Sequence, residues 1–388
     1  MDVGRRGLQM VAVQRDSMPV LLVCLVLAGL GLVMVYSSSS VLANIRFGDS
    51  SFFLKKQSFR LLIGLSMMLV LAQVPPHWWA RLARPIMLAS FCSLLLVLVW
   101  GQGPAQRWLS LPALGMGLTI QPAEFAKLAL VLYLADVLVR KRDEIHRFRR
   151  GLLPRLLVVG CVLVLIALQP DLGTAIALGL IALIMLWVGG VRWLHLAGAG
   201  LAALVGIGLS LISSSYQMQR LSSFWDPEGE PDGYYQVLQS LYGLGSGGLF
   251  GVGLGNSMQK EQYLPEPHTD FVFAFVGEEL GLVGTLAVLG LFVAFAFYGL
   301  RIGRQAGDEH GFLVATGITA MISIYALLNI GVVTGMLPTT GLPLPFVSYG
   351  GSSLLGNMAG VGILLGVARS ASGGSKRPER VRRLVRDR

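Results

Sequence analysis

The stretch Pro265-Glu-Pro-His-Thr-Asp270-Phe-Val-Phe-Ala-Phe-Val-Gly277 marks the point where a long polar insert runs into an apolar segment. The insert covers residues 214–270 and is rich in glycine and aromatic residues, whereas most of the chain consists of apolar segments of membrane-spanning length. A loop this long inside a compact membrane protein is usually functional or disordered. Paired glycines and aromatic residues are not typical of a flexible linker. The sequence therefore predicts a functional loop that brings the Asp270 carboxylate to the membrane surface.

The composition of the whole chain is that of a membrane protein. Of its 388 residues, 54% are hydrophobic and only 13% are charged, which excludes an ordinary soluble domain. We predict an all-α integral membrane protein with about ten transmembrane helices and a large extracytoplasmic loop between helices 7 and 8. The expected spans are 18–36, 59–75, 84–100, 123–139, 156–168, 172–189, 194–213, 271–300, 312–334 and 351–368.

The distribution of Lys and Arg predicts the orientation. With the N-terminus in the cytoplasm, most of the 31 basic residues fall on the inner side, as the positive-inside rule requires. Both termini are then cytoplasmic and the insert is outside. The net charge of +10 is accordingly a topology signal and not a sign of nucleic-acid binding. We expect a cytoplasmic N-terminal segment (1–17), one polytopic membrane domain (18–369) and a basic cytoplasmic tail (370–388).

A first group of polar residues surrounds Asp270 at the end of the insert. Asp270 precedes an apolar run, where a carboxylate can cap a helix and is favoured by the helix dipole. A cap alone would predict few other special residues nearby, whereas this segment is crowded with them, so function is favoured for Asp270. For Glu278 and Glu279 both explanations stay open. The other candidate binding residues of this group are Lys260, His268 and Thr269.

A second group lies in Gln121-Pro-Ala-Glu124-Phe-Ala-Lys127. Glu124 fits the first turn of a helix, and the i,i+3 spacing lets it pair with Lys127 on one face. A helix start does not explain a lysine one turn deeper in the bilayer, where a charged group is costly and functional by default. Both residues are therefore candidate substrate-binding residues.

Two further charged residues belong to the outer side. Arg107, next to a tryptophan, is either a member of the second group or a membrane anchor. Asp171, in Gln169-Pro-Asp-Leu-Gly-Thr174, is either the cap of the sixth expected helix or the partner of Lys127 or Arg107. Neither alternative is settled by the sequence.

The segment from Asn329 to Ser353 holds prolines and glycines that bar a regular helix. At membrane depth such backbone survives only when it is buried in protein or lines a polar cavity. We expect it to shape the site, with Ser348 and Ser352 as hydrogen-bond donors to a substrate.

Several other features predict structure and not chemistry. The glycines of 245–255 lack the spacing of a nucleotide-binding loop and are expected to form tight turns. Cys24, Cys92 and Cys161 fall in apolar spans and are expected to be core thiols. No His and Cys set in the sequence has the spacing of metal ligands.

Five motifs occur in the order found in the SEDS family (FtsW, RodA and SpoVE), and the chain resembles that family from Val20 to Arg369. Gly255-Asn-Ser and Tyr263-Leu-Pro resemble division-type members, whereas Asp226-Pro-Glu228 resembles elongation-type members; the division type is favoured. The five motifs are Gln106-Arg-Trp108, Gln121-Pro-Ala-Glu124, Gln169-Pro-Asp-Leu-Gly-Thr174, Pro265-Glu-Pro-His-Thr-Asp-Phe271 and Pro345-Phe-Val-Ser-Tyr-Gly-Gly-Ser-Ser353.

The resemblance implies a multi-pass protein of the bacterial inner membrane that polymerises lipid II into peptidoglycan glycan strands. It implies Asp270 as the catalytic base of an inverting transfer that releases undecaprenyl diphosphate. The leaving group needs positive charge, for which Lys127, Arg107 and a divalent cation (Mg²⁺ or Mn²⁺) are candidates. The implied partners are a class B penicillin-binding protein, which is the transpeptidase, and other membrane proteins of the division or elongation machinery.

Two other functions stay open at this point. The same buried charges could form a path for the headgroup in a lipid II flippase. A scaffold without catalytic activity, which only recruits partners, is the third alternative.

Overall fold

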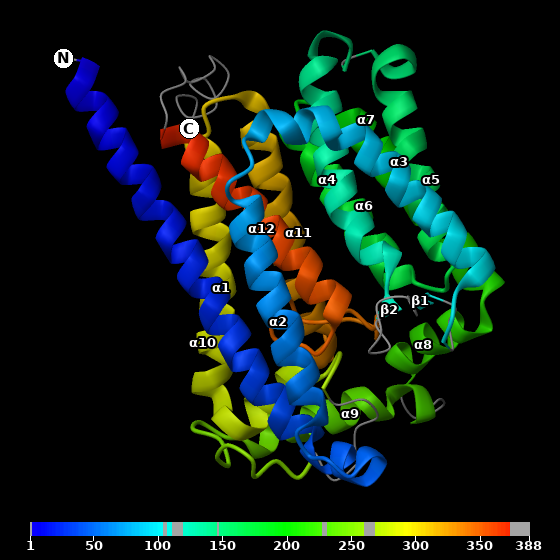
Figure 1. The fold of residues 1–388 in the computed structure, drawn as a ribbon. Helices are drawn as coiled ribbons and strands as arrows, with labels where there is room; N and C mark the ends of the chain where they lie inside the picture. Colours follow the sequence, from blue (N-terminus) through cyan, green and yellow to red (C-terminus); the bar gives the residue numbers. More distant parts are fainter. Residues whose placement is uncertain are drawn as a thin grey trace.

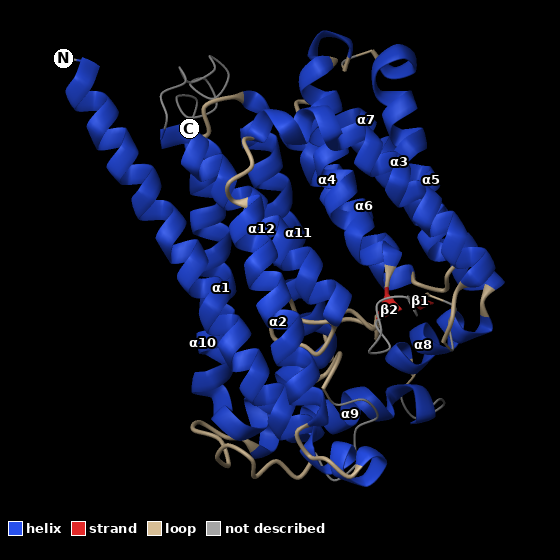
Figure 2. Cartoon of the chain, in the orientation of Figure 1, coloured by secondary structure: helices blue, strands red, loops and turns tan. Residues whose placement is uncertain are grey.

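The computed structural model describes residues 2–103, 107–110, 119–145, 147–226, 231–259 and 268–372, and it is built almost wholly of helices (Figure 2). In chain order these are α1 (Asp2–Phe47), α2 (Phe52–Leu71), α3 (Pro76–Trp100), α4 (Pro122–Arg140), the 3-10 turn η2 (Arg142–Glu144), the π-turn η3 (Phe148–Leu152), α5 (Leu153–Ala167), α6 (Leu172–Val188), α7 (Trp193–Ser213), α8 (Ser215–Trp225), α9 (Pro231–Ser246), α10 (Val272–Gln305), α11 (Glu309–Val333) and α12 (Gly351–Ser372). Two short antiparallel strands, β1 (Leu109–Ser110) and β2 (Thr119–Ile120), join α3 to α4.

The long helices run side by side between two ends of a bundle (Figure 1). The labelled termini lie at one end, and α8, α9, β1 and β2 lie at the opposite end. We refer to these as the terminal end and the loop end. The helices α8 and α9 of the insert are thus at the end opposite to the start of α1 and the end of α12 (Figure 1). Which end faces the cytoplasm stays a prediction.

Each of the ten expected spans overlaps one helix, and the all-α membrane fold is confirmed. Five of the spans run past a helix end by one to four residues: 59–75, 156–168, 172–189, 271–300 and 312–334. Seven helices of the described chain are long and apolar enough to cross a membrane. The other three expected spans lie in α2 and α4, which each carry at least three charged residues, and in the shorter α6. A total of ten crossings therefore stays a prediction.

The division of the chain is only partly visible. Residues 2–17 continue as helix α1, and α12 extends to Ser372, so most of the expected basic tail, 370–388, lies outside the described residues. The expected boundaries stay a prediction.

The core of the bundle is one large cluster of buried apolar side chains. α1 packs against α10 and α12, and α4 packs against α3, α6 and α11. α7 contributes no buried residue, so it lies at the edge of the bundle. Cys24 is buried in this core, but the side chains of Cys92 and Cys161 are exposed, which corrects the expectation of three core thiols.

A glycine turn, residues 247–255, lies directly against a break in α10. At the break Gly281 has φ 68° and ψ −164°, a conformation that glycine adopts readily because it has no Cβ atom. The backbone N–H of Val252 donates to Glu278 O at 2.9 Å, and the N–H of Leu282 donates to Gly248 O at 2.9 Å. A Cβ atom at Gly281 would lie 2.6 Å from Leu249 O, so the close approach requires glycine. The expectation of tight turns is confirmed.

Candidate functional site

Asp270 lies at the loop end, directly before α10. The helix begins at Val272 with Phe271 at its N-cap position, so Asp270 is not the N-cap. The side-chain amide of Asn329 in α11 donates to the backbone oxygen of Asp270 and to that of Leu342, both at 2.7 Å. One buried amide thus ties the start of α10 to the irregular segment after α11.

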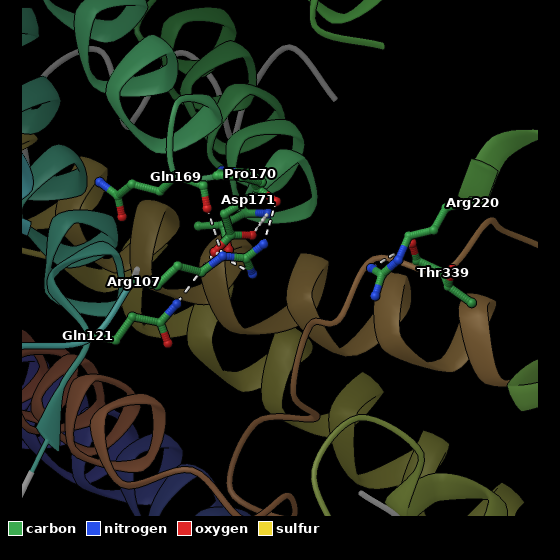
Figure 3. Close-up of polar contacts among 8 residues, drawn as sticks. Arg107, Gln121, Gln169, Pro170, Asp171, Arg220 and Thr339 are labelled. Carbon is green, nitrogen blue, oxygen red and sulfur yellow. Dashed lines mark hydrogen bonds and ion pairs between the residues drawn. The ribbon is translucent and has the colours of Figure 1, made fainter. Parts of the chain in front are cut away.

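A small cavity of about 10 Å³, the size of a single water molecule, lies beside Asp270. Arg220 of α8 reaches this cavity, and its Nη1 donates to Thr339 O at 3.4 Å (Figure 3). A Cβ atom at Gly341 would lie 3.4 Å from Asp270 Oδ2 and 3.8 Å from Arg220 Nη1, so both side chains converge over this glycine. The lining residues are Arg220, Gln236, Asp270, Phe271, Asn329, Val332, Thr339, Thr340, Gly341 and Leu342.

Arg220 was not among the residues that the sequence predicted for the site. The signal available for it is its place in the insert, since basic residues are scarce on the outer side of a membrane protein. What brings it to Asp270 is a long-range contact between α8 and residues 339–341, which no local pattern encodes.

His268 and Thr269 lead into Asp270 and differ in burial. His268 is buried, with its ring centre 4.4 Å from that of Phe53 and 5.2 Å from that of Tyr349. Burial lowers the pKa of His268 to about 4, so the ring is neutral at pH 7. The backbone N–H of Tyr349 donates to His268 O at 2.8 Å. Thr269 is half-buried. Lys260 lies outside the described residues.

Glu124 and Lys127 form the ion pair that their spacing predicts. Lys127 Nζ lies 2.5 Å from Glu124 Oε2, and the two side chains are 1% and 3% exposed. The same nitrogen lies 3.9 Å from the ring centre of Tyr325, a cation–π contact. Lys127 does not line the cavity beside Asp270. The pair is a second, separate cluster, buried in the bundle.

Arg107 holds the break between α5 and α6 (Figure 3). Its Nε donates to Gln169 O at 2.7 Å, its Nη2 donates to Pro170 O, and its Nη1 lies 3.7 Å from Asp171 Oδ2. Asp171 also accepts from the backbone N–H of Thr174 at 3.2 Å. Asp171 is therefore both the cap of α6 and the partner of Arg107. Within the described chain the ion pair of Arg107 is with Asp171 and not with Glu124, and its role as a binding residue or a membrane anchor stays a prediction.

Ser348 and Ser352 act as acceptors in this structure. Ser348 Oγ accepts from the N–H of Leu344 at 2.8 Å, and Ser352 Oγ accepts from the N–H of Gln121 at 3.0 Å. The second bond joins α12 to the start of α4, next to Glu124. The expected donation from these hydroxyls to a substrate stays a prediction.

Glu278 and Glu279 have structural partners. Glu278 accepts from the hydroxyl of Ser257 and, at 2.8 Å, from the backbone N–H of Met258, which fixes the end of the glycine turn. Glu279 accepts from the hydroxyl of Ser37 in α1. Within the described residues no three His, Cys, Asp or Glu side chains gather as a metal site would require. Among the described residues that line the cavity, Asp270 is the one carboxylate.

Comparison with known proteins places this geometry in a family. The sequence model of the cell cycle proteins FtsW, RodA and SpoVE matches residues 18–373. A probable peptidoglycan glycosyltransferase FtsW of Geobacter sp. (strain M18) is 40% identical over 366 residues, which cover 93% of this chain and 99% of that protein. The stage V sporulation protein E of Bacillus subtilis (strain 168) is 43% identical over 350 residues, which cover 90% of this chain and 95% of that protein.

The fold also matches a solved structure. It is a chain of a peptidoglycan synthase complex, solved to describe the structural coordination of polymerization and crosslinking. The two chains align with a TM-score of 0.75 at 29% sequence identity, covering 91% of this chain and 97% of the other.

Proposed function

Because the chain belongs to the family of cell cycle proteins FtsW, RodA and SpoVE, we propose that it is a division-type peptidoglycan glycosyltransferase that polymerises lipid II into glycan strands. Names of the FtsW type predominate among its relatives, which supports division over elongation. The observation that supports this activity most is the position of Asp270. Asn329 holds its backbone directly before α10, and its side chain lines the same cavity as that of Arg220. The protein is a multi-pass membrane protein, and we assign it to the bacterial cytoplasmic membrane with both termini in the cytoplasm.

The reaction needs a base and an inversion. The 4-hydroxyl oxygen of the acceptor sugar attacks the anomeric carbon of the donor and forms a β-1,4 bond, while the α-linked bond to the lipid diphosphate breaks. The Asp270 carboxylate takes the hydroxyl proton as the oxygen attacks, which contributes about 10²–10⁴-fold to the rate. Undecaprenyl diphosphate leaves with the bonding electrons.

The diphosphate gains charge as it leaves and needs cations nearby. Arg220 is the cation in the lining of the Asp270 cavity, so we add it to Lys127 and Arg107 as a ligand of the diphosphate. Lys127 is held by Glu124, and Arg107 is held by Asp171, so the two carboxylates position these cations. The serines at 348 and 352 and the residues 268–269 would bind the sugar and peptide parts.

A divalent cation would find few protein ligands here. Mg²⁺ takes one or two carboxylates together with phosphate oxygens and water, and the described part of the cavity lining offers one carboxylate, that of Asp270. No step of the mechanism above passes through a metal ion.

A class B penicillin-binding protein is the partner that we propose. The similarity to a chain of a complex that coordinates polymerization with crosslinking supports this pairing. The glycan strands made at the loop end would be crosslinked by a transpeptidase on the same side of the membrane.

The Asp270→Asn variant tests the base. Asparagine keeps the size and the hydrogen bonding of the side chain but cannot take a proton, so glycan synthesis from lipid II should fall at least about 10²-fold. Polymer length is read on gels with the purified complex, and the unfolding temperature of the variant serves as the control for folding. Near wild-type synthesis by a folded Asp270→Asn protein would refute the role of Asp270.

A further inference from the structure

A groove is lined by residues of α3, α4 and α5 and of the turns η2 and η3 between α4 and α5. The start of α3 and the connection from α4 to α5 lie at the terminal end of the bundle (Figure 1). The volume of the groove is about 690 Å³. Its wall is apolar and faces outward, since Leu88 and Leu157 are 65% and 60% exposed. In a membrane these side chains would face hydrocarbon, so the groove opens sideways to the lipid. The apolar lining residues are Met87, Leu88, Phe91, Val137, Leu157 and Val158.

Cations gather at one end of this groove. Arg84, Lys141, Arg150 and Arg155 line it, and Glu144 is the one acidic residue among the described lining residues. Ion pairs do not neutralise all of this positive charge. In the described chain they engage two of the four cations, Arg84 and Lys141.

Arg155 is the least exposed of these cations. Arg155 is 5% exposed, and within the described chain no carboxylate forms an ion pair with it. Its Nη1 donates to the backbone oxygens of Arg150 (2.9 Å) and Gly151. These bonds aim the guanidinium at the π-turn η3, where Arg150 is exposed at the rim. Burying a cation without a carboxylate is costly, which points to an anion that is supplied from outside the chain.

We propose that this groove binds an anionic glycerophospholipid, with an acyl chain along the α3 and α5 wall and the phosphate at Arg150 and Arg155. The apolar wall of the groove matches the acyl chain of such a lipid, and the basic side chains match its phosphate. With the terminal end in the cytoplasm, the lipid comes from the inner leaflet. The groove and the Asp270 cavity share no lining residue. The lipid in the groove is therefore a bound structural lipid and not the substrate.

The first experiment compares two neighbouring arginines. Arg149 and Arg150 are both exposed, and of the two only Arg150 is among the lining residues of the groove. Full-length protein is stripped of lipid in detergent and titrated with phosphatidylglycerol or phosphatidylcholine under native mass spectrometry. We expect the wild-type protein to prefer phosphatidylglycerol, Arg150→Gln to weaken that binding about fivefold, the contribution of one basic residue near a lipid surface, and Arg149→Gln to leave it unchanged.

The second experiment needs no substitution. Cys161 lines the groove, Cys92 is exposed outside it, and Cys24 is buried. Phosphatidylglycerol should slow the modification of Cys161 by N-ethylmaleimide severalfold, with Cys92 in the same molecule as the unaffected control, as read by peptide mass spectrometry.

Three results would overturn the proposal. These are equal binding of the two phospholipids, equal losses in Arg149→Gln and Arg150→Gln, and equal protection of Cys92 and Cys161. If a polyprenyl diphosphate protects Cys161 much more strongly than phosphatidylglycerol does, the choice of lipid is wrong. The groove would then be a binding site for the lipid part of the substrate.

Discussion

Lys127 and Arg220 are two proposed ligands of the diphosphate, and their side chains have different surroundings. Lys127 is 1% exposed and sits between the Glu124 carboxylate and the ring of Tyr325. Arg220 is half-buried at the rim of the Asp270 cavity and donates to a backbone oxygen of the irregular segment. A charge that is already neutralised in the bundle must be released before it can bind a diphosphate, whereas a charge at the cavity can bind directly.

The Lys127→Met substitution tests the buried cation. Methionine keeps the apolar stem and removes the charge, so polymerisation of lipid II should be lost. The change also leaves Glu124 buried without its partner, which destabilises a protein by about 3–5 kcal/mol. The double variant Glu124→Gln with Lys127→Met removes that cost and is the variant to assay.

The comparison of activity with stability decides the outcome. A double variant that melts like the wild type and makes no polymer would support Lys127 as a diphosphate ligand. If it polymerises normally, Lys127 is structural, and Arg220→Gln should then carry the larger loss.

The residues of the site were predicted unevenly from the sequence, for physical reasons. The Glu124–Lys127 pair follows from i,i+3 spacing on one helix, and the Arg107–Asp171 pair was one of two alternatives. The roles of Ser348 and Ser352 could not be derived, because their partners lie on backbone that only the folded segment brings near. Arg220 was missed for the same reason.

At the scale of elements, α1 contacts the irregular segment through a glycine. A Cβ atom at Gly31 would lie 2.6 Å from Phe346 O and 2.8 Å from Val347 Cα. Phe346 has φ 66°, so this part of the segment already holds a conformation that side chains rarely adopt. The segment has little freedom to retreat from a larger residue.

The Gly31→Ala substitution should therefore be costly although alanine favours helices. Overpacking of this kind destabilises by about 1–3 kcal/mol, and displacement of the segment that carries Ser348 should also reduce polymerisation. Gly29→Ala is the matched control, because nothing lies within 4 Å of its added Cβ. Thermal unfolding in detergent measures both, and equal unfolding temperatures for the two variants would contradict the close packing.

The elements themselves were largely predictable. Apolar runs located every long helix, since burial in lipid demands continuous hydrophobicity. The helices α8 and α9 inside the insert were not predicted, because short amphipathic helices in a polar loop give no such run. The tight glycine turn was expected, but its docking onto the break at Gly281 depends on contacts across the chain.

For the whole molecule, the family and the enzyme class predicted from five motifs are confirmed. Asp270 directly precedes α10, and that helix begins at the loop end of the bundle (Figure 1). This position favours chemistry on one side of the membrane over transport across it. A path for a headgroup would depend on charges at several depths, whereas a base is needed only where acceptor and donor meet.

Catalysis in detergent separates the two activities, since no compartments exist there. The wild-type protein with its cognate penicillin-binding protein should make glycan strands from lipid II. Asp270→Ala should abolish the polymer while lipid II binding changes by no more than a few-fold. The flippase alternative wins if detergent yields no polymer and proteoliposomes translocate lipid II in a manner that Asp270→Ala stops.

The glycine turn has a consequence for how the enzyme meets membranes of different thickness. Backbone groups of residues 247–255 make hydrogen bonds to α10, and the apolar side chains of this turn are left for the surroundings. Leu249, Phe250 and Leu254 are 61%, 80% and 58% exposed. With the loop end outside, as we propose, these groups would enter the outer leaflet. In the proposed mechanism the depth of Asp270 in the membrane is then set by the same interface that carries the lipid-linked sugar. A thinner or thicker bilayer would move both together, and the reacting atoms would keep their alignment.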